Sequence, residues 1–134
     1  MYLLDTNIIS FLQKGNTNVI TKISATLPSN LHLCSITVAE LLFGAISNPN
    51  NDRGQMQKKY YLELFNNTEI FDFDFAAAIK FAELKSTLQQ TGSIIEDFDL
   101  QIASIALANN LILVTNNTKH FLRVPNLQLE DWSN

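Results

Sequence analysis

The stretch "IEDFDLQIASIALANNLILVTNN", residues 95–117, carries the clearest fold signal in the chain. Residues 96–110 have apolar and small side chains at helical spacing, which predicts a helix. "LILVT", residues 111–115, has the length and composition of a buried strand, and two asparagines follow it. A helix that leads into a buried strand is typical of α/β proteins, in which helices cover a mostly parallel sheet.

The same alternation of helices and strands extends outward in both directions. Composition and periodicity predict strands at residues 1–4, 31–36, 69–73, 111–115 and 127–131. They predict helices at residues 6–15, 18–27, 37–46, 55–67, 74–92 and 96–110. Pro, Asn and Gly in "SNPNNDRG" predict a loop over residues 47–54. We therefore expect one α/β domain that spans residues 1–134, with a central sheet flanked by helices.

Composition narrows the classes of protein further. The chain has 134 residues, of which 46% are hydrophobic and 16% charged, so it has material for a core and too little charge for a disordered chain. Cys34 is the only cysteine, which excludes an internal disulfide and favours a reducing cytoplasm. No stretch approaches the roughly 18 apolar residues of a membrane helix. The net charge of −4 means that a nucleic-acid ligand would need a bound cation, a basic patch or a partner.

Two aspartates lie at the start of the helix predicted at residues 96–110. Asp99 shares a helical face with the small and apolar residues Ile102, Ala103 and Ala106. A carboxylate on such a core-facing stripe is costly unless it is paired or bound to a metal. Asp97 instead lies on a more mixed face and is a candidate N-cap. We therefore interpret Asp99 as functional and Asp97 as structural.

Other polar residues follow the predicted strands. Asp5 follows the first strand, Glu40 lies early in the helix after the second, and Asn116 and Asn117 follow "LILVT". In α/β sheets functional groups collect at the carboxyl ends of the strands. Acids that meet there repel one another, which raises their pKa values or requires a cation. A hard ion such as Mg²⁺ prefers oxygen ligands and would lower the pKa of a bound water.

Four motifs in order resemble PIN-domain ribonucleases, and among them the VapC-type toxins of type II toxin–antitoxin systems. They are "YLLDTN" (residues 2–7), "ITVAELLFGA" (36–45), "DFDLQIASIALANNLILVTNNTKHF" (97–121) and "VPNLQLEDW" (124–132). The resemblance runs from Met1 to about Trp132 and so covers essentially the whole chain. It implies a Rossmann-like three-layer sandwich with a mostly parallel sheet.

The resemblance also implies a set of site residues. The catalytic positions of the family fall on Asp5, Glu40, Asp99 and Asn117. Among these the metal ligands are Asp5, Asp99 and Asn117, where asparagine is an uncharged oxygen ligand. Secondary pocket positions fall on Thr6, Thr115, Asp97 and Asn116. His120 departs from the family, which often has an acid before the phenylalanine of this motif.

The activity implied is that of a Mg²⁺- or Mn²⁺-dependent endoribonuclease that cuts structured RNA, such as tRNA or ribosomal RNA, with a metal-activated water. The tail resembles the branch that cuts the anticodon region of initiator tRNA. The partners implied are a second copy of the chain and a VapB-type antitoxin, whose C-terminal segment covers the acidic groove. Near the acids, Lys119, His120 and Arg123 are candidate RNA contacts, although a solvated loop is an equal reading.

Three features leave alternatives open. Asn7 stands where an aspartyl-phosphate phosphatase usually has its second acid, which weakens but does not remove that reading. Asn117, in place of an acid, leaves room for a non-catalytic module that binds RNA or protein. Tyr60, Tyr61, Leu64 and Phe65 on one predicted helix suggest a surface for the dimer or the antitoxin.

Overall fold

A five-stranded parallel sheet forms the centre of the computed structural model, which describes residues 1–134. The strand order is β3-β2-β1-β4-β5, and every neighbouring pair is parallel. The strands are β1 (Tyr2–Leu4), β2 (Leu31–Cys34), β3 (Glu69–Phe71), β4 (Ile112–Val114) and β5 (Leu129–Glu130). The predicted α/β sandwich is therefore confirmed, with a fully parallel sheet.

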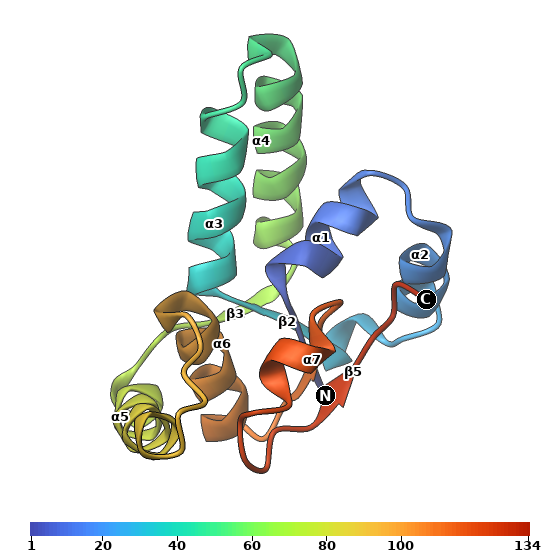
Figure 1. Cartoon of the computed structure of the whole chain (residues 1–134). Coiled ribbons are helices and arrows are strands. Elements are labelled where there is room, and N and C mark those ends of the chain that lie inside the picture. Colours follow the sequence, from blue (N-terminus) through green and yellow to red (C-terminus); the bar gives the residue numbers. More distant parts are fainter.

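Helices cover both faces of this sheet (Figure 1). They are α1 (Thr6–Gln13), α2 (Thr17–Ser24), α3 (Ser35–Ile46), α4 (Asn51–Asn66), α5 (Phe75–Gln90), α6 (Asp97–Ala108) and α7 (Thr118–Phe121), with a 3₁₀ turn at Pro28–Asn30. As predicted, Asp74 caps α5 by accepting a hydrogen bond from the Ala77 amide, 3.0 Å away. No helix is both long enough and apolar enough to span a bilayer.

Two hydrophobic clusters form the layers on either side of the sheet. Alternate strand residues point to opposite faces, so Leu3 and Leu113 join one cluster, whereas Leu4 and Val114 join the other. The first cluster packs under α5, α6 and α7, and the second under α1 to α4. This arrangement leaves the carboxyl ends of β1, β2 and β4 at one edge, where α1, α3 and α7 begin.

Three sequence-based predictions need correction. The loop predicted at residues 47–54 is shorter, because Asn50 accepts a hydrogen bond from the Arg53 amide at 3.1 Å and caps α4, which begins at Asn51. The segment around Lys119, for which a solvated loop was one of two interpretations, contains the short helix α7. Asp97 is the first residue of α6 and not its N-cap, a position that Glu96 occupies without a side-chain hydrogen bond.

Helices α3 and α4 form a hairpin that projects away from the sheet (Figure 1). Tyr61 and Phe65 are buried against the core, with exposed fractions of 4% and 8%. The predicted partner surface on this helix therefore does not include these two residues. The exposed large hydrophobic residues of the hairpin are Phe43, Ile46, Met56, Tyr60 and Leu62.

Candidate active site

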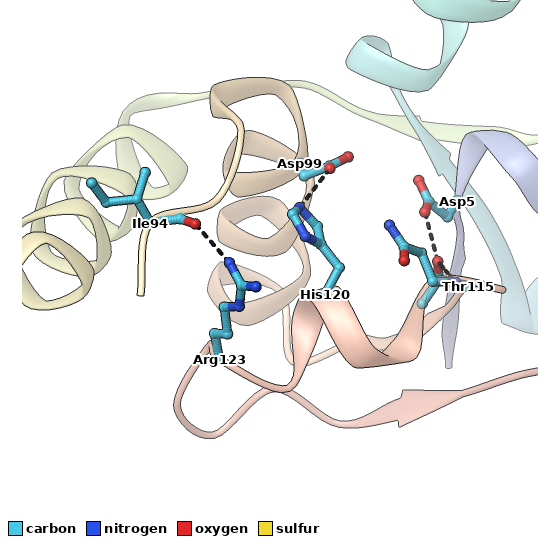
Figure 2. Close-up of polar contacts among 7 residues, drawn as sticks. Asp5, Ile94, Asp99, Thr115, His120 and Arg123 are labelled. Carbon is cyan, nitrogen blue, oxygen red and sulfur yellow. Dashed lines mark hydrogen bonds and ion pairs between the residues drawn. The ribbon is translucent and has the colours of Figure 1, made fainter. Parts of the chain in front are cut away.

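Asp5 is the most deeply buried acid in the chain, with 4% of its surface exposed, and it directly follows β1. Its Oδ1 accepts a hydrogen bond from the Thr6 amide at 2.8 Å, so the side chain caps α1. Its Oδ2 accepts one from Thr115 Oγ1, also at 2.8 Å (Figure 2). Thr115 Oγ1 in turn accepts a hydrogen bond from the Asn117 amide at 3.0 Å. Asp5 is therefore both a helix cap and a fixed acceptor at the edge of the sheet.

Glu40 reaches this edge from α3. Thr6 Oγ1 donates a hydrogen bond to Glu40 Oε1 at 2.7 Å. The hydroxyl oxygens of Thr6 and Thr37 lie 3.2 Å apart, and Thr37 is fully buried. Thr6 therefore links two acids, since its amide contacts Asp5 while its hydroxyl contacts Glu40.

Asp99 comes from the first turn of α6, on the face that the helical spacing predicts. Ile102, Ala103 and Ala106 of that face are fully buried. The Asp99 side chain is 25% exposed, and its Oδ2 lies 3.1 Å from His120 Nε2 of α7 (Figure 2). A carboxylate is thus held at the rim of the core beside an imidazole ring.

Burial raises the pKa values of all three acids. For Asp5 the hydrogen bond from Thr115 opposes this rise, and the charge of Asp99 adds to it. For Glu40 the hydrogen bond from Thr6 opposes the rise, and the charges of Asp5 and Glu96 add to it. For Asp99 the nearby His120 opposes the rise, and Glu96 and Glu40 add to it. The three acids therefore lie close enough to repel one another.

As the side chains lie, no three of the histidine, cysteine, aspartate and glutamate side chains converge closely enough to hold a metal ion. The acids share one edge, but each contacts a hydroxyl group or an imidazole instead of a common centre. Their donor chemistry nevertheless fits a divalent ion, because buried carboxylates that raise each other's pKa values are stabilised by a cation. Asn117 adds an exposed amide at the same edge.

The remaining candidate residues have other contacts. Asp97 is exposed and pairs with Lys85 of α5 at 2.9 Å, so its side chain contacts α5 and not the three acids. The Asn116 amide contacts Asn7 Oδ1 at 3.3 Å, and its side chain contacts Ser133 Oγ at 3.3 Å.

Besides His120, two basic residues were predicted to contact RNA, and one of them, Arg123, is hydrogen-bonded within the chain. Its Nη1 donates a hydrogen bond to the Ile94 carbonyl at 2.8 Å, which ties down the segment before α6 (Figure 2). Lys119 is exposed on α7. A role for Lys119 and Arg123 in RNA binding stays a prediction.

The site residues predicted from the sequence did not include Thr37 or Glu96. Thr37 lies one helical turn before Glu40 on α3, so i, i+3 spacing was the available signal. Glu96 precedes α6, and its charge helps to raise the pKa values of Glu40 and Asp99. That effect crosses between elements, so no local pattern reveals it.

The raised pKa of Asp5 leads to a prediction about the metal-free protein. The pKa of Asp5 is higher in the folded protein than its ordinary value of 3.8. The protein therefore loses stability as the pH rises from 3.8 through that raised pKa. We expect Asp5→Asn to raise the Tm in EDTA at pH 7.5 by about 3 °C or more, and to change it less at pH 4. Thermal denaturation followed by circular dichroism measures both. A variant less stable than the parent at both pH values would show that the hydrogen bonds outweigh burial.

Fold and site together define a class of protein, an α/β domain with acids at the carboxyl edge of a parallel sheet. The chain belongs to the PIN domain family, whose sequence model matches residues 2–127. It is 37% identical to Ribonuclease VapC2 of Rickettsia felis over 98% of both chains. It is also 33% identical to the tRNA(fMet)-specific endonuclease VapC of Shigella flexneri, again over 98% of both. These identities place it among the VapC-type members of the family.

Solved structures agree with this assignment. VapBC2 from Rickettsia felis, bound to a DNA fragment from its promoter, matches with a TM-score of 0.84 and 37% identity, over 98% of both chains. DNA-bound VapBC from Salmonella typhimurium matches with a TM-score of 0.89 and 27% identity, over 98% of this chain and 97% of that one. The fold therefore agrees over nearly the full length.

Proposed function

We propose that this protein is a divalent-metal-dependent endoribonuclease that acts as the toxin of a toxin–antitoxin pair. The observation that carries the proposal is the carboxyl edge of the sheet, where buried Asp5 shares its surroundings with Glu40 and Asp99. Asp5, Asp99 and Asn117 would hold the ion, which is Mg²⁺ or Mn²⁺ in the sequence-based prediction. When bound, the ion would lower the pKa of water and neutralise charge on the phosphodiester under attack.

The residues of the chain supply position and charge. Thr115 and the Thr6 amide orient both oxygens of Asp5, so this carboxylate has little freedom to turn. Thr6 Oγ1 orients Glu40, whose second oxygen remains free to accept a proton from water or to contact the ion. Because the net charge is −4, a cation at this edge would bridge the acidic protein and the anionic RNA.

Structured RNA is the proposed substrate class, with tRNA favoured over ribosomal RNA. The support is the 33% identity to a relative named as a tRNA(fMet)-specific endonuclease. The proposed partners are a VapB-type antitoxin and a second copy of the chain. The match to solved VapBC assemblies supports the first. We place the protein in the cytoplasm, where the buried thiol of Cys34 would stay reduced.

The contacts of Asp5 weigh against the aspartyl-phosphate alternative. Such a nucleophile must be reached by a phosphoryl group, whereas Asp5 is 4% exposed and both of its oxygens accept hydrogen bonds. The residue two positions on is Asn7, whose Oδ1 accepts a hydrogen bond from the Asn116 amide. The place of the second acid is therefore taken by a structural contact.

Cleavage of RNA by the purified protein tests the proposed function. We expect a few discrete products from total RNA in Mg²⁺ or Mn²⁺ and none in EDTA. Asp5→Ala should cut at least about 100-fold more slowly, because it removes a ligand at the centre of the site. Circular dichroism would show whether the variant is folded.

Two results would contradict the proposal. Cleavage that persists in EDTA, or in Asp5→Ala at the parent rate, would mean that this site does not cut RNA. Binding of RNA without cleavage in any divalent metal would favour the non-catalytic module.

A further inference from the structure

His120 occupies a position of interest beside the proposed metal ligands. It lies on α7, and its Nε2 is 3.1 Å from Oδ2 of Asp99, on the neighbouring helix α6 (Figure 2). His120 is also one of the groups that lower the pKa of Asp5, and its side chain is 25% exposed. His120 therefore faces the inside of the site and not the solvent side of α7.

The contact between the two side chains is close but incomplete. The distance suits an ion pair, and Nε2 is a buried polar atom without a hydrogen-bond partner. A buried polar atom normally has a partner. The geometry therefore leaves an imidazole nitrogen directed at a carboxylate with its own bonding capacity unused.

A shared metal ion would account for this spacing. Two adjacent ligands of an octahedral ion, each bonded at about 2.1 Å, lie about 3.0 Å apart. The observed separation of Nε2 and Oδ2 is 3.1 Å. In the tautomer with its proton on Nδ1, His120 would present a lone pair from Nε2 to the same ion as Asp99.

We propose that His120 Nε2 is a metal ligand beside Asp99, and that it makes this site prefer a nitrogen-binding first-row transition-metal ion over Mg²⁺. Imidazole suits ions such as Co²⁺ and Zn²⁺, whereas sites built from carboxylate, carbonyl and water suit Mg²⁺. Toxins of this kind often carry an acid at this position, whereas an imidazole supplies a nitrogen donor and no negative charge to attract a hard ion. This inference rests on the proposed metal site. It adds His120 as a ligand and a preference among divalent ions.

Metal titration of the protein without RNA tests the inference. The probes are Co²⁺ and Mg²⁺, titrated by calorimetry at pH 7.5 into the metal-free parent, His120→Ala and His120→Asp. We expect His120→Ala to weaken Co²⁺ binding by at least about tenfold and to change Mg²⁺ binding by less than about threefold. His120→Asp should strengthen Mg²⁺ binding and so reverse the preference. The visible spectrum of bound Co²⁺, which reports nitrogen ligation, should change in both variants.

Leu122→Ala is the matched control, because Leu122 caps the same short helix and is 73% exposed. It should leave both affinities and the Co²⁺ spectrum unchanged. If His120→Ala strengthens the binding of both ions, His120 competes with the ion for Asp99 and the inference is wrong. Equal affinities in the parent and His120→Ala would also overturn it. If the parent binds neither ion, the proposed metal site itself fails, which separates that failure from the failure of the His120 assignment.

Discussion

Asp99→Asn is expected to lower kcat/KM for RNA cleavage by at least about 100-fold, whereas Asp97→Asn should change it by less than about twofold. The two residues lie in the same turn of α6, but only Asp99 faces the acids of the site. Asp97 faces Lys85, and its side chain is 57% exposed. An exposed ion pair of this kind contributes about 0.2–1 kcal/mol to stability.

This pair of variants makes the same chemical change at two neighbouring positions. Each removes one negative charge from the first turn of α6, so any general effect of charge on the helix or on RNA binding is shared. Cleavage of a defined RNA under single-turnover conditions, at saturating Mn²⁺, measures the difference. Equal losses in the two variants would mean that charge near the helix start matters, and not the position of Asp99.

Gly54→Ala is expected to lower the free energy of unfolding by about 1–3 kcal/mol. Gly54 is buried in α4, and a Cβ atom there would clash with the carbonyl oxygen of Ala45 in α3. That oxygen belongs to the backbone, so the two helices must move apart to make room. The gain in helix propensity, about 0.5–1 kcal/mol, offsets only a part of this cost.

Gly44→Ala provides the matched control on the partner helix. A Cβ atom at Gly44 would meet nothing within 4 Å, so we expect the helix-propensity gain of about 0.5–1 kcal/mol to appear as increased stability. Urea denaturation of both variants in EDTA, followed by circular dichroism, gives the comparison. If Gly54→Ala is as stable as Gly44→Ala, α3 and α4 are not packed as closely as the structure indicates.

The placement of the candidate residues was predictable where one element carried the signal. Helical spacing alone distinguished Asp99 from Asp97, because the residues that share a face with Asp99 are small or apolar and are fully buried. The strand ends located Asp5 in the same way. The N-cap of α6 was not predictable, since Asp97 and Glu96 are adjacent acids and the cap makes no side-chain hydrogen bond that would favour either.

Contacts between side chains of different helices and strands could not be predicted from the sequence. The pairing of His120 with Asp99 joins α7 to α6, and the link through Thr6 joins Asp5 to Glu40 across separate segments. The loop prediction for residues 47–54 was also wrong in extent, because glycine is a common turn residue and Gly54 was assigned to the loop. In the structure it is the glycine that lets α4 approach α3.

The sequence by itself determined the α/β class and a mostly parallel sheet, and it predicted the acids of the candidate site, because periodicity and strand ends are local properties of a chain. Only the tertiary structure decided the strand order β3-β2-β1-β4-β5, the close approach of α4 to α3 at Gly54, and the partner of each acid. These features depend on which distant segments pack together. The free energy of such packing comes from contacts between side chains that no local pattern of residues records.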